Sequence, residues 1–163
     1  MKKVTSIILF SLIFVSCSYR NQKKQTVTET RFLSGISNDS LKIRTVYQLV
    51  KTITDSVIEY EYLSKIDSTR NFKAYYNKSQ SELVLGFTSY KKKEINRLIN
   101  QDISNFGFDS YVHIKPEIDE MGPILFNHKY GILAIGNPLG PVAAFTDYKP
   151  EFNVIYQIFE KLY

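Results

Sequence analysis

Residues 58–62 read Ile-Glu-Tyr-Glu-Tyr, so that large apolar and acidic side chains alternate along the chain. Because successive side chains of a strand point to opposite faces, this period of two predicts a strand over about residues 56–63. Ile58, Tyr60 and Tyr62 would share one face, and the two glutamates would share the other. A continued helix stays the alternative, since short mixed runs fit both periods.

Further short runs of β-branched and aromatic residues are separated by turn residues, which is typical of strands joined by hairpins. The sequence predicts them over residues 72–76, 82–88, 110–115, 124–126, 130–135 and 142–145.

Two long helices are expected between and before these strands. Residues 38–40 read Asn-Asp-Ser and can cap a helix over residues 41–54, in which apolar residues recur near helical spacing. Ser89 can cap a second helix that runs to about Phe106, where Gly107 would end it.

A last helix is expected from near Pro150, a residue that suits the first helical position. Together these elements predict one α+β domain over residues 31–163, in which a mostly antiparallel sheet packs against two or three helices, including the C-terminal one.

The first twenty residues have a different character from the rest. Lys2 and Lys3 precede a short apolar run over residues 7–15, and polar sequence resumes directly after Cys17. A basic start, a short apolar core and small residues at its end are the layout of a secretory signal. The run is well short of the roughly 20 apolar residues that a membrane-spanning helix needs.

The residues Phe14-Val15-Ser16-Cys17 resemble the lipobox of bacterial lipoproteins, although Phe14 stands where Leu is commonest. The resemblance implies removal of residues 1–16 and acylation of Cys17, which would hold the chain on membrane lipid. Ser18 in place of Asp implies passage to the outer membrane, with the domain facing the periplasm. It implies nothing about the domain that follows.

Three other interpretations of this segment stay open. A secretory signal could be cut after Ser18, which would discard Cys17. The apolar run could remain uncleaved as an anchor, or it could be a buried helix of a cytosolic protein.

Cys17 is the only cysteine of the 163 residues, so no disulfide within the chain and no cysteine metal site can form.

The formal net charge of +5 gives little information about the domain. Lys2 and Lys3 carry two of these charges and residues 17–30 carry a further net two, so residues 31–163 are close to neutral. Nucleic-acid binding is not expected, because it needs clustered lysine and arginine on the domain itself. Residues 17–30 are expected to be the lipidated cysteine and a flexible tether.

Two sets of residues could form contact surfaces. Lys91, Lys92 and Lys93 would open the second helix against its dipole, where they could hold an anion, a lipid head group or an acidic partner, or be three solvated lysines. The tyrosines could form a surface for a protein or glycan, or supply an aromatic core; the set considered is Tyr60, Tyr62, Tyr75 and Tyr76.

Catalytic and metal-binding motifs are weak. His113 and His128, with Glu117, Asp119 and Glu120 between them, are the best set, but they lack the spacing of known zinc motifs. Residues 136–140 contain two glycines but lack the phosphate-loop pattern. No cofactor and no catalytic residue is predicted, and there is no serine nucleophile motif.

Two functions remain as the main hypotheses, and a purely structural spacer is a third possibility. The first is an envelope lipoprotein that acts as a non-enzymatic binding module, with a protein or glycan of the envelope as its partner. The second is a small periplasmic hydrolase or metal-dependent enzyme that uses His113 and His128. The enzyme requires both histidines to converge with a carboxylate, and the binding module requires an exposed contact surface.

Overall fold

The computed structural model describes residues 24–37, 40–115, 121–137 and 141–163. Within these ranges the chain forms ten strands, one short 3-10 helix and one α-helix. In chain order they are β1 (Gln25–Ser37), β2 (Ser40–Ile53), β3 (Val57–Ser64), η1 (Ser68–Arg70), β4 (Phe72–Asn77), β5 (Glu82–Leu85), β6 (Thr88–Leu98), β7 (Phe108–His113), β8 (Ile124–Asn127), β9 (Gly131–Ile135), β10 (Ala143–Thr146) and α1 (Phe152–Glu160).

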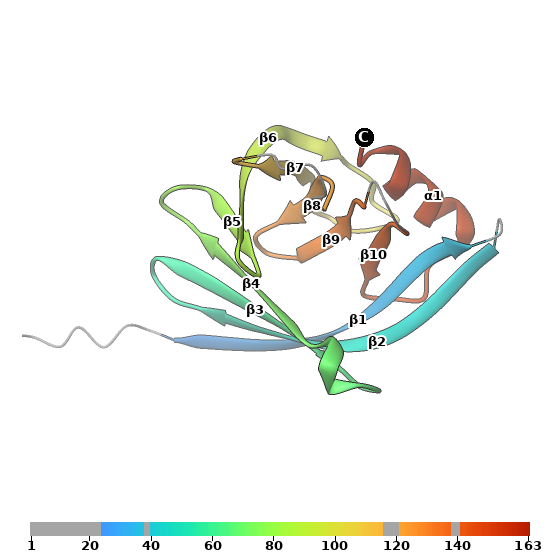
Figure 1. The fold of residues 1–163 in the computed structure, drawn as a ribbon, viewed down its shortest axis with the longest axis horizontal. Coiled ribbons are helices and arrows are strands. Elements are labelled where there is room, and N and C mark those ends of the chain that lie inside the picture. The colour runs from blue at the N-terminus through green and yellow to red at the C-terminus, as the bar shows by residue number, and fades with distance from the viewer. Residues whose placement is uncertain (1–23, 38–39, 116–120, 138–140) are drawn as a thin grey trace, which may run out of the picture.

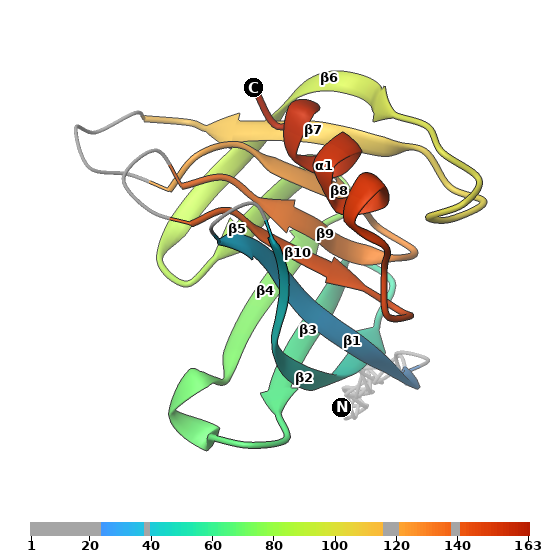
Figure 2. The ribbon, with the colours of Figure 1, turned by 90° about the vertical axis from the view of Figure 1, so that its right-hand side faces the viewer.

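The strands form a closed barrel in which each strand is antiparallel to both of its neighbours (Figures 1 and 2). Consecutive strands pair from β1 through to β10, and β1 closes the barrel by pairing with β10 over residues 32–34. Where β1 and β10 pair, neither strand has a free edge. The contact between β1 and β10 is short, so the first half of β1 extends past the end of β10.

The predicted α+β fold class is wrong. The sheet is antiparallel as expected, but the described residues contain a single α-helix, and the segments expected to be the first two helices are strands β2 and β6. The C-terminal helix is present as α1, which begins two residues after Pro150.

β2 was mistaken for a helix because its buried face contains polar residues. The side chains that point into the barrel are Thr45, Tyr47, Leu49 and Lys51, which alternate strictly but are not all apolar. Val46 and Val50, on the opposite face, gave the apolar spacing that indicated a helix. The alternation of β2 can be recognised only if Thr45 and Lys51 are counted as inward residues, which requires knowledge of their partners inside the protein.

β6 was mistaken for a helix because its pairing with β7 is irregular. The register between these strands shifts between Lys92 and Glu94 and again between Glu94 and Leu98. A bulge places an extra residue on one strand and so breaks the alternation of faces. Ile95, which the helix would have buried, is 70% exposed.

The strand predicted from the alternation over residues 56–63 is confirmed as β3. The strands predicted over residues 72–76, 82–88, 110–115, 124–126, 130–135 and 142–145 correspond to β4, β5, β7, β8, β9 and β10. The first strand begins before residue 31. Residues 25–30 pair with β2, although the sequence predicts that they belong to the tether.

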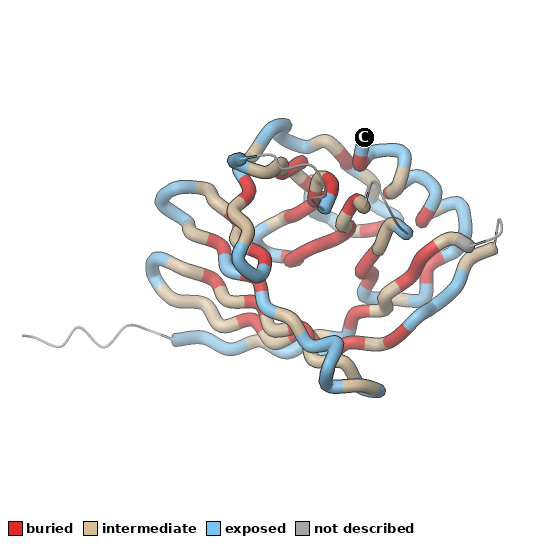
Figure 3. The backbone as a smooth tube through the Cα atoms, viewed as in Figure 1, coloured by how far each residue is buried: buried red, intermediate tan, exposed pale blue. Residues whose placement is uncertain are grey.

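Two clusters of buried side chains stabilise the fold. The first lies inside the barrel and is rich in tyrosine, with Tyr47, Tyr60, Tyr62, Tyr76, Tyr90 and Tyr111 among its members. The second lies outside the barrel, where Ile155, Ile158 and Leu162 of the C-terminal segment pack over β8, β9 and β10. In Figure 3 the buried stretches follow the strands, and exposed stretches lie on the turns, at the start of β1 and on parts of β6 and α1.

Candidate functional site

One end of the barrel, where β1 begins, is the place where several turns meet. Gln25 at the start of β1 pairs with Ile53 at the end of β2. Because every neighbour is antiparallel, the β2–β3, β4–β5 and β8–β9 connections lie at this same end. Figure 1 shows the start of β1 beside the β2–β3 and β4–β5 turns on its left side. We call this end the N-terminal mouth.

The N-terminal mouth contains a cavity of about 580 Å³. This volume lies within the range of roughly 300–1,000 Å³ that is typical of small-molecule sites. The cavity has an apolar wall and a basic rim, and its lining residues are Lys51, Ile53, Ile58, Tyr76, Lys78, His128 and Lys129.

The apolar wall comes from three neighbouring strands. Ile58 and Tyr76 are directly paired on β3 and β4, and Ile53 pairs with Ile58 from β2. Ile58 and Tyr76 are buried in the barrel core, and Ile53 packs against the same core. The imidazole of His128 stacks on Tyr76 with ring centroids 6.1 Å apart, so it extends this wall toward the β8–β9 turn.

Below the cavity, tyrosine hydroxyls hold the β8–β9 hairpin in place. Tyr60 donates a 2.6 Å hydrogen bond to the carbonyl oxygen of His128, and Tyr62 accepts one of 2.9 Å from the backbone N–H of Ile132. Burial raises the pKa of both phenols well above the ordinary value. The two tyrosines are therefore neutral hydrogen-bonding groups at any physiological pH.

The hairpin itself has a conformation that only certain residues allow. The side-chain oxygen of Asn127 accepts hydrogen bonds from the backbone N–H groups of Lys129 and Tyr130, which shapes the turn. Gly131 has a φ of +100°, and a Cβ there would lie 2.8 Å from the hydroxyl oxygen of Tyr62. Glycine at this position lets the tyrosine approach the backbone and so places His128 and Lys129 on the rim.

Two rim lysines lack a carboxylate partner among the ion pairs of the described residues. The Nζ of Lys78 donates a 2.6 Å hydrogen bond to the carbonyl oxygen of Thr54. The Nζ of Lys129 lies 5.5 Å from the ring centroid of Phe106. Neither contact neutralises the positive charge, so both ammonium groups contribute a positive potential at the mouth.

The third rim lysine belongs to a buried charge network. Lys51 and Arg31 both bind the carboxylate of Glu29, and Arg31 does so at 2.5 Å. Lys51 also donates a 2.7 Å hydrogen bond to the carbonyl oxygen of Lys129. The network therefore links β1 and β2 to the β8–β9 turn across the part of the barrel that β10 does not reach.

His128 is surrounded mostly by positive charge. Burial, followed by the charges of Lys129 and Lys92, lowers its pKa below the ordinary value, while Asp109 opposes the shift. The imidazole is therefore neutral at neutral pH, and its protonation would add another positive charge to the mouth.

The tyrosines that were considered as a contact surface do not share one. Tyr60 and Tyr62 are fully buried inside the barrel and Tyr76 is nearly so, whereas Tyr75 points outward and is 37% exposed. The alternation of β3 and β4 separates the four residues in this way. The other interpretation, an aromatic core, agrees with the positions of the three buried tyrosines.

The three consecutive lysines do not lie at a helix terminus. Lys91, Lys92 and Lys93 are on β6, where alternation leaves Lys91 and Lys93 exposed and Lys92 partly buried. Lys92 pairs with Asp109 at 2.6 Å. Since the segment is a strand, the expected conflict with a helix dipole does not arise.

The two histidines lie at opposite ends of the barrel. His113 ends β7, and its Nε2 lies 2.6 Å from the carbonyl oxygen of Met121, whereas His128 lies near the start of β7. Glu117, Asp119 and Glu120 lie outside the described residues. Within the described ranges no three histidine, cysteine, aspartate or glutamate side chains are close enough to hold a metal ion.

Cys17 also lies outside the described residues. In the part of the chain that the structure describes, no helix is long and apolar enough to cross a bilayer.

Glu29, Arg31 and Lys51 were missed as site residues. Glu29 falls within the tether that the sequence predicts over residues 17–30, and Lys51 falls within the helix predicted over residues 41–54. A signal was present, because Thr26, Thr28 and Thr30 alternate with the inward residues of β1, and threonine is favoured in strands. The pairing of the charges could not be found, since Glu29 and Lys51 meet only through the register of β1 and β2.

The chain matches no family model, no curated protein and no solved structure.

Proposed function

We propose that this protein is a membrane-anchored envelope lipoprotein whose barrel is a non-enzymatic binding module for a small ligand with an apolar body. The anchor is the acylated Cys17, as the lipobox resemblance implies. Closed antiparallel barrels can hold one small ligand when their interior is not completely filled by side chains.

The observation that carries this proposal is the cavity of about 580 Å³ at the N-terminal mouth. Ile53, Ile58 and Tyr76 offer it an apolar wall, and apolar area removed from water contributes about 25 cal/mol per Å². The wall is supported from below by buried tyrosines that are hydrogen-bonded to the backbone. A site that is already formed binds with little ordering cost.

The enzyme hypothesis lacks the geometry that it required. Proton transfer or metal binding by His113 and His128 needs their rings to converge. The barrel places them at opposite ends, each against a carbonyl oxygen or an aromatic ring rather than beside the other. We therefore do not propose the two-histidine enzyme.

The binding proposal is tested by photolabelling of the full chain in membranes with a diazirine-bearing fatty alcohol, a neutral probe. The expected result is labelling of peptides that contain residues 51–58, 76–78 and 128–129. Ile53→Trp would fill the cavity and lower labelling about tenfold, which corresponds to about 1.4 kcal/mol. Ile43→Trp is the matched control on the same strand, because Ile43 is 43% exposed.

Labelling that is equal in Ile53→Trp and Ile43→Trp would overturn the binding site. So would labelling spread evenly over the barrel surface, because it would show that the probe marks exposed protein in general.

A further inference from the structure

The chain enters the barrel beside the cavity. Gln25 is the first residue of β1, and its partner Ile53 lines the cavity. Cys17 is eight residues before Gln25, and a trans chain spans at most about 3.5 Å per residue. If Cys17 is acylated as proposed, the start of β1 lies within about 28 Å of the membrane surface.

The lining of the cavity contains three lysines and no carboxylate. Two nearby carboxylates are already engaged, since Glu29 pairs with Arg31 and Lys51 while Asp109 pairs with Lys92. Asp55 and Asp147 lie at the same end of the barrel but outside the lining of this cavity. Glu82 lies at the same end, but it is on the outer face of β5, because the alternating residues Leu83 and Leu85 are buried in the barrel core. Lys78 and Lys129 are thus the two lysines of the cavity lining that form no ion pair in the described residues.

The apolar wall and the basic rim of the cavity would contact different parts of a ligand. The apolar wall suits a hydrocarbon segment, and two ammonium groups suit a carboxylate or a phosphate, to which they can donate charge-assisted hydrogen bonds. A neutral ligand would leave the two positive charges without a partner. A small polar anion would leave the apolar side of the cavity unoccupied.

We propose that the ligand of the N-terminal mouth is a single-chain anionic lipid, with its acyl segment against Ile53, Ile58 and Tyr76 and its head group on Lys78 and Lys129. This inference rests on the proposed function and deepens it by naming the ligand class. The short link to Cys17 holds the mouth near the membrane that supplies the lipid. The negative surface potential of a membrane that contains anionic lipids attracts nearby lysines.

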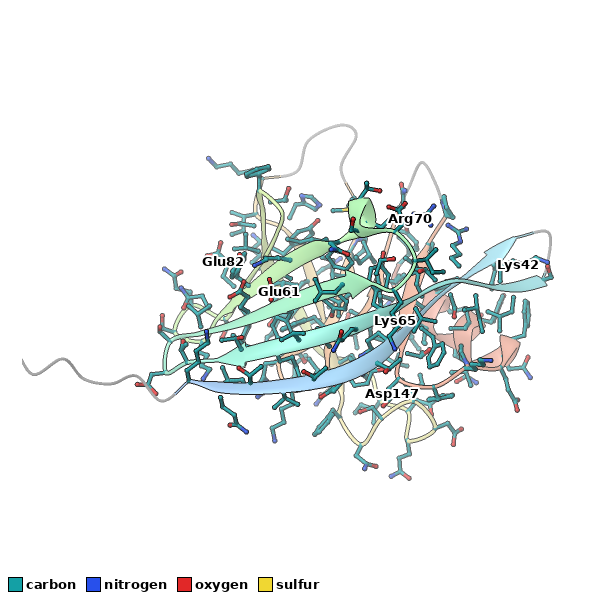
Figure 4. All side chains as sticks on the ribbon, turned by 90° about the horizontal axis from the view of Figure 1, so that it is seen from below. Lys42, Glu61, Lys65, Arg70, Glu82 and Asp147 are labelled. Atoms are coloured by element: carbon teal, nitrogen blue, oxygen red, sulfur yellow. The ribbon has the colours of Figure 1, made fainter. Side chains whose placement is uncertain are left out.

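The test compares two diazirine probes of equal chain length, a fatty acid and a fatty alcohol, on the full chain in membranes. The acid should label the mouth peptides about tenfold more strongly than the alcohol. The double variant Lys78→Gln/Lys129→Gln should remove this preference, so that the acid and the alcohol label the mouth peptides equally. Lys42→Gln is the control, because Lys42 is exposed at the opposite end of the barrel (Figure 4).

The outcomes separate the two proposals. Equal labelling of the mouth by both probes would overturn the anionic head group and leave the binding module standing. Failure of both probes to label the mouth would overturn both proposals. Unlabelled fatty acid and inorganic phosphate are each added as competitors of labelling by the diazirine fatty acid. If phosphate lowers labelling at the same concentration as the unlabelled fatty acid, the site binds a free anion, and the lipid assignment is overturned.

Discussion

Arg31 of β1 donates a 2.8 Å hydrogen bond to the carbonyl oxygen of Tyr130 in the β8–β9 turn, although β10 lies between their strands in the barrel order. Its guanidinium carbon also lies 4.1 Å from the centroid of the Tyr130 ring. The barrel is therefore closed at this point by a side chain and not by a backbone ladder. The same contact holds the β8–β9 turn, which carries the cavity residues His128 and Lys129.

Replacement of Glu29 should be strongly destabilising. Glu29→Gln removes the one carboxylate that Arg31 and Lys51 share, and these cations are only 2% and 7% exposed. A buried charge that loses its partner costs about 3–5 kcal/mol. The free energy of unfolding from urea titration would measure the loss.

Glu59→Gln is the control for this change. Glu59 pairs with Lys73 on the outer face of the barrel at 2.9 Å, where both side chains reach solvent. Exposed pairs contribute about 0–1 kcal/mol, so this variant should stay close to the parent. Equal losses in the two variants would contradict a special role of the buried network.

Gly131→Ala should be more destabilising than Gly86→Ala. Both glycines have positive φ, which disfavours alanine by about 1 kcal/mol. A Cβ at Gly131 would also meet the Tyr62 hydroxyl, whereas at Gly86 nothing lies within 4 Å. A double-mutant cycle with Tyr62→Phe should show a favourable coupling, and additive losses would contradict the clash.

The stability of the protein should fall at acidic pH because of His128. Its folded-state pKa is lowered, so the unfolded chain takes up the proton first as the pH falls through about 6.5. The loss grows until the folded-state pKa is passed and is absent well above pH 7. Urea midpoints between about pH 8 and pH 5 should therefore drop less for His128→Gln than for the parent.

His113→Gln serves as the control, because its ring is at the far end of the barrel against Met121. This variant should keep the pH dependence that His128 produces. A parent and a His128→Gln variant with parallel pH profiles would show that His128 makes no contribution.

The C-terminal helix should contribute to stability through its inner face. Ile155 is fully buried in the cluster between α1 and the barrel, whereas its neighbour Tyr156 is 50% exposed. Ile155→Ala should cost about 2–5 kcal/mol. Tyr156→Ala should change the free energy of unfolding by about 0.5 kcal/mol or less. A small effect of Ile155→Ala would mean that the helix is dispensable for the barrel.

Membrane attachment should depend on Cys17. The mature chain is expected to start at Cys17, to be heavier than its sequence by the acyl groups, and to sediment with membranes. Two or more acyl chains give stable attachment where one gives only marginal binding. Intact-mass measurement and membrane fractionation beside Cys17→Ser would check this. An unmodified chain that fractionates identically in both forms would contradict the anchor.

Several elements could be predicted from the sequence because their patterns are local. The alternation of Ile58, Tyr60 and Tyr62 gave β3, since all its inward residues are large and apolar. Pro150 and the apolar spacing after it gave α1 in the same way. In such segments apolar side chains face the core and polar side chains face solvent. The strand or helix period is therefore visible in the order of apolar and polar residues.

The barrel and its mouth were decided by contacts between segments far apart in the chain. Thr45 and Lys51 are buried in β2 because partners from β1, β3 and the β8–β9 turn form hydrogen bonds with them. Since these inward residues are polar, the sequence of β2 does not show the alternation of apolar and polar residues that is typical of a strand. Closure of β1 onto β10 joins residues more than a hundred positions apart. The sequence by itself determined where most strands lie. Only the tertiary structure decided which polar groups could be buried, because burial of a charge depends on a partner that local sequence does not name.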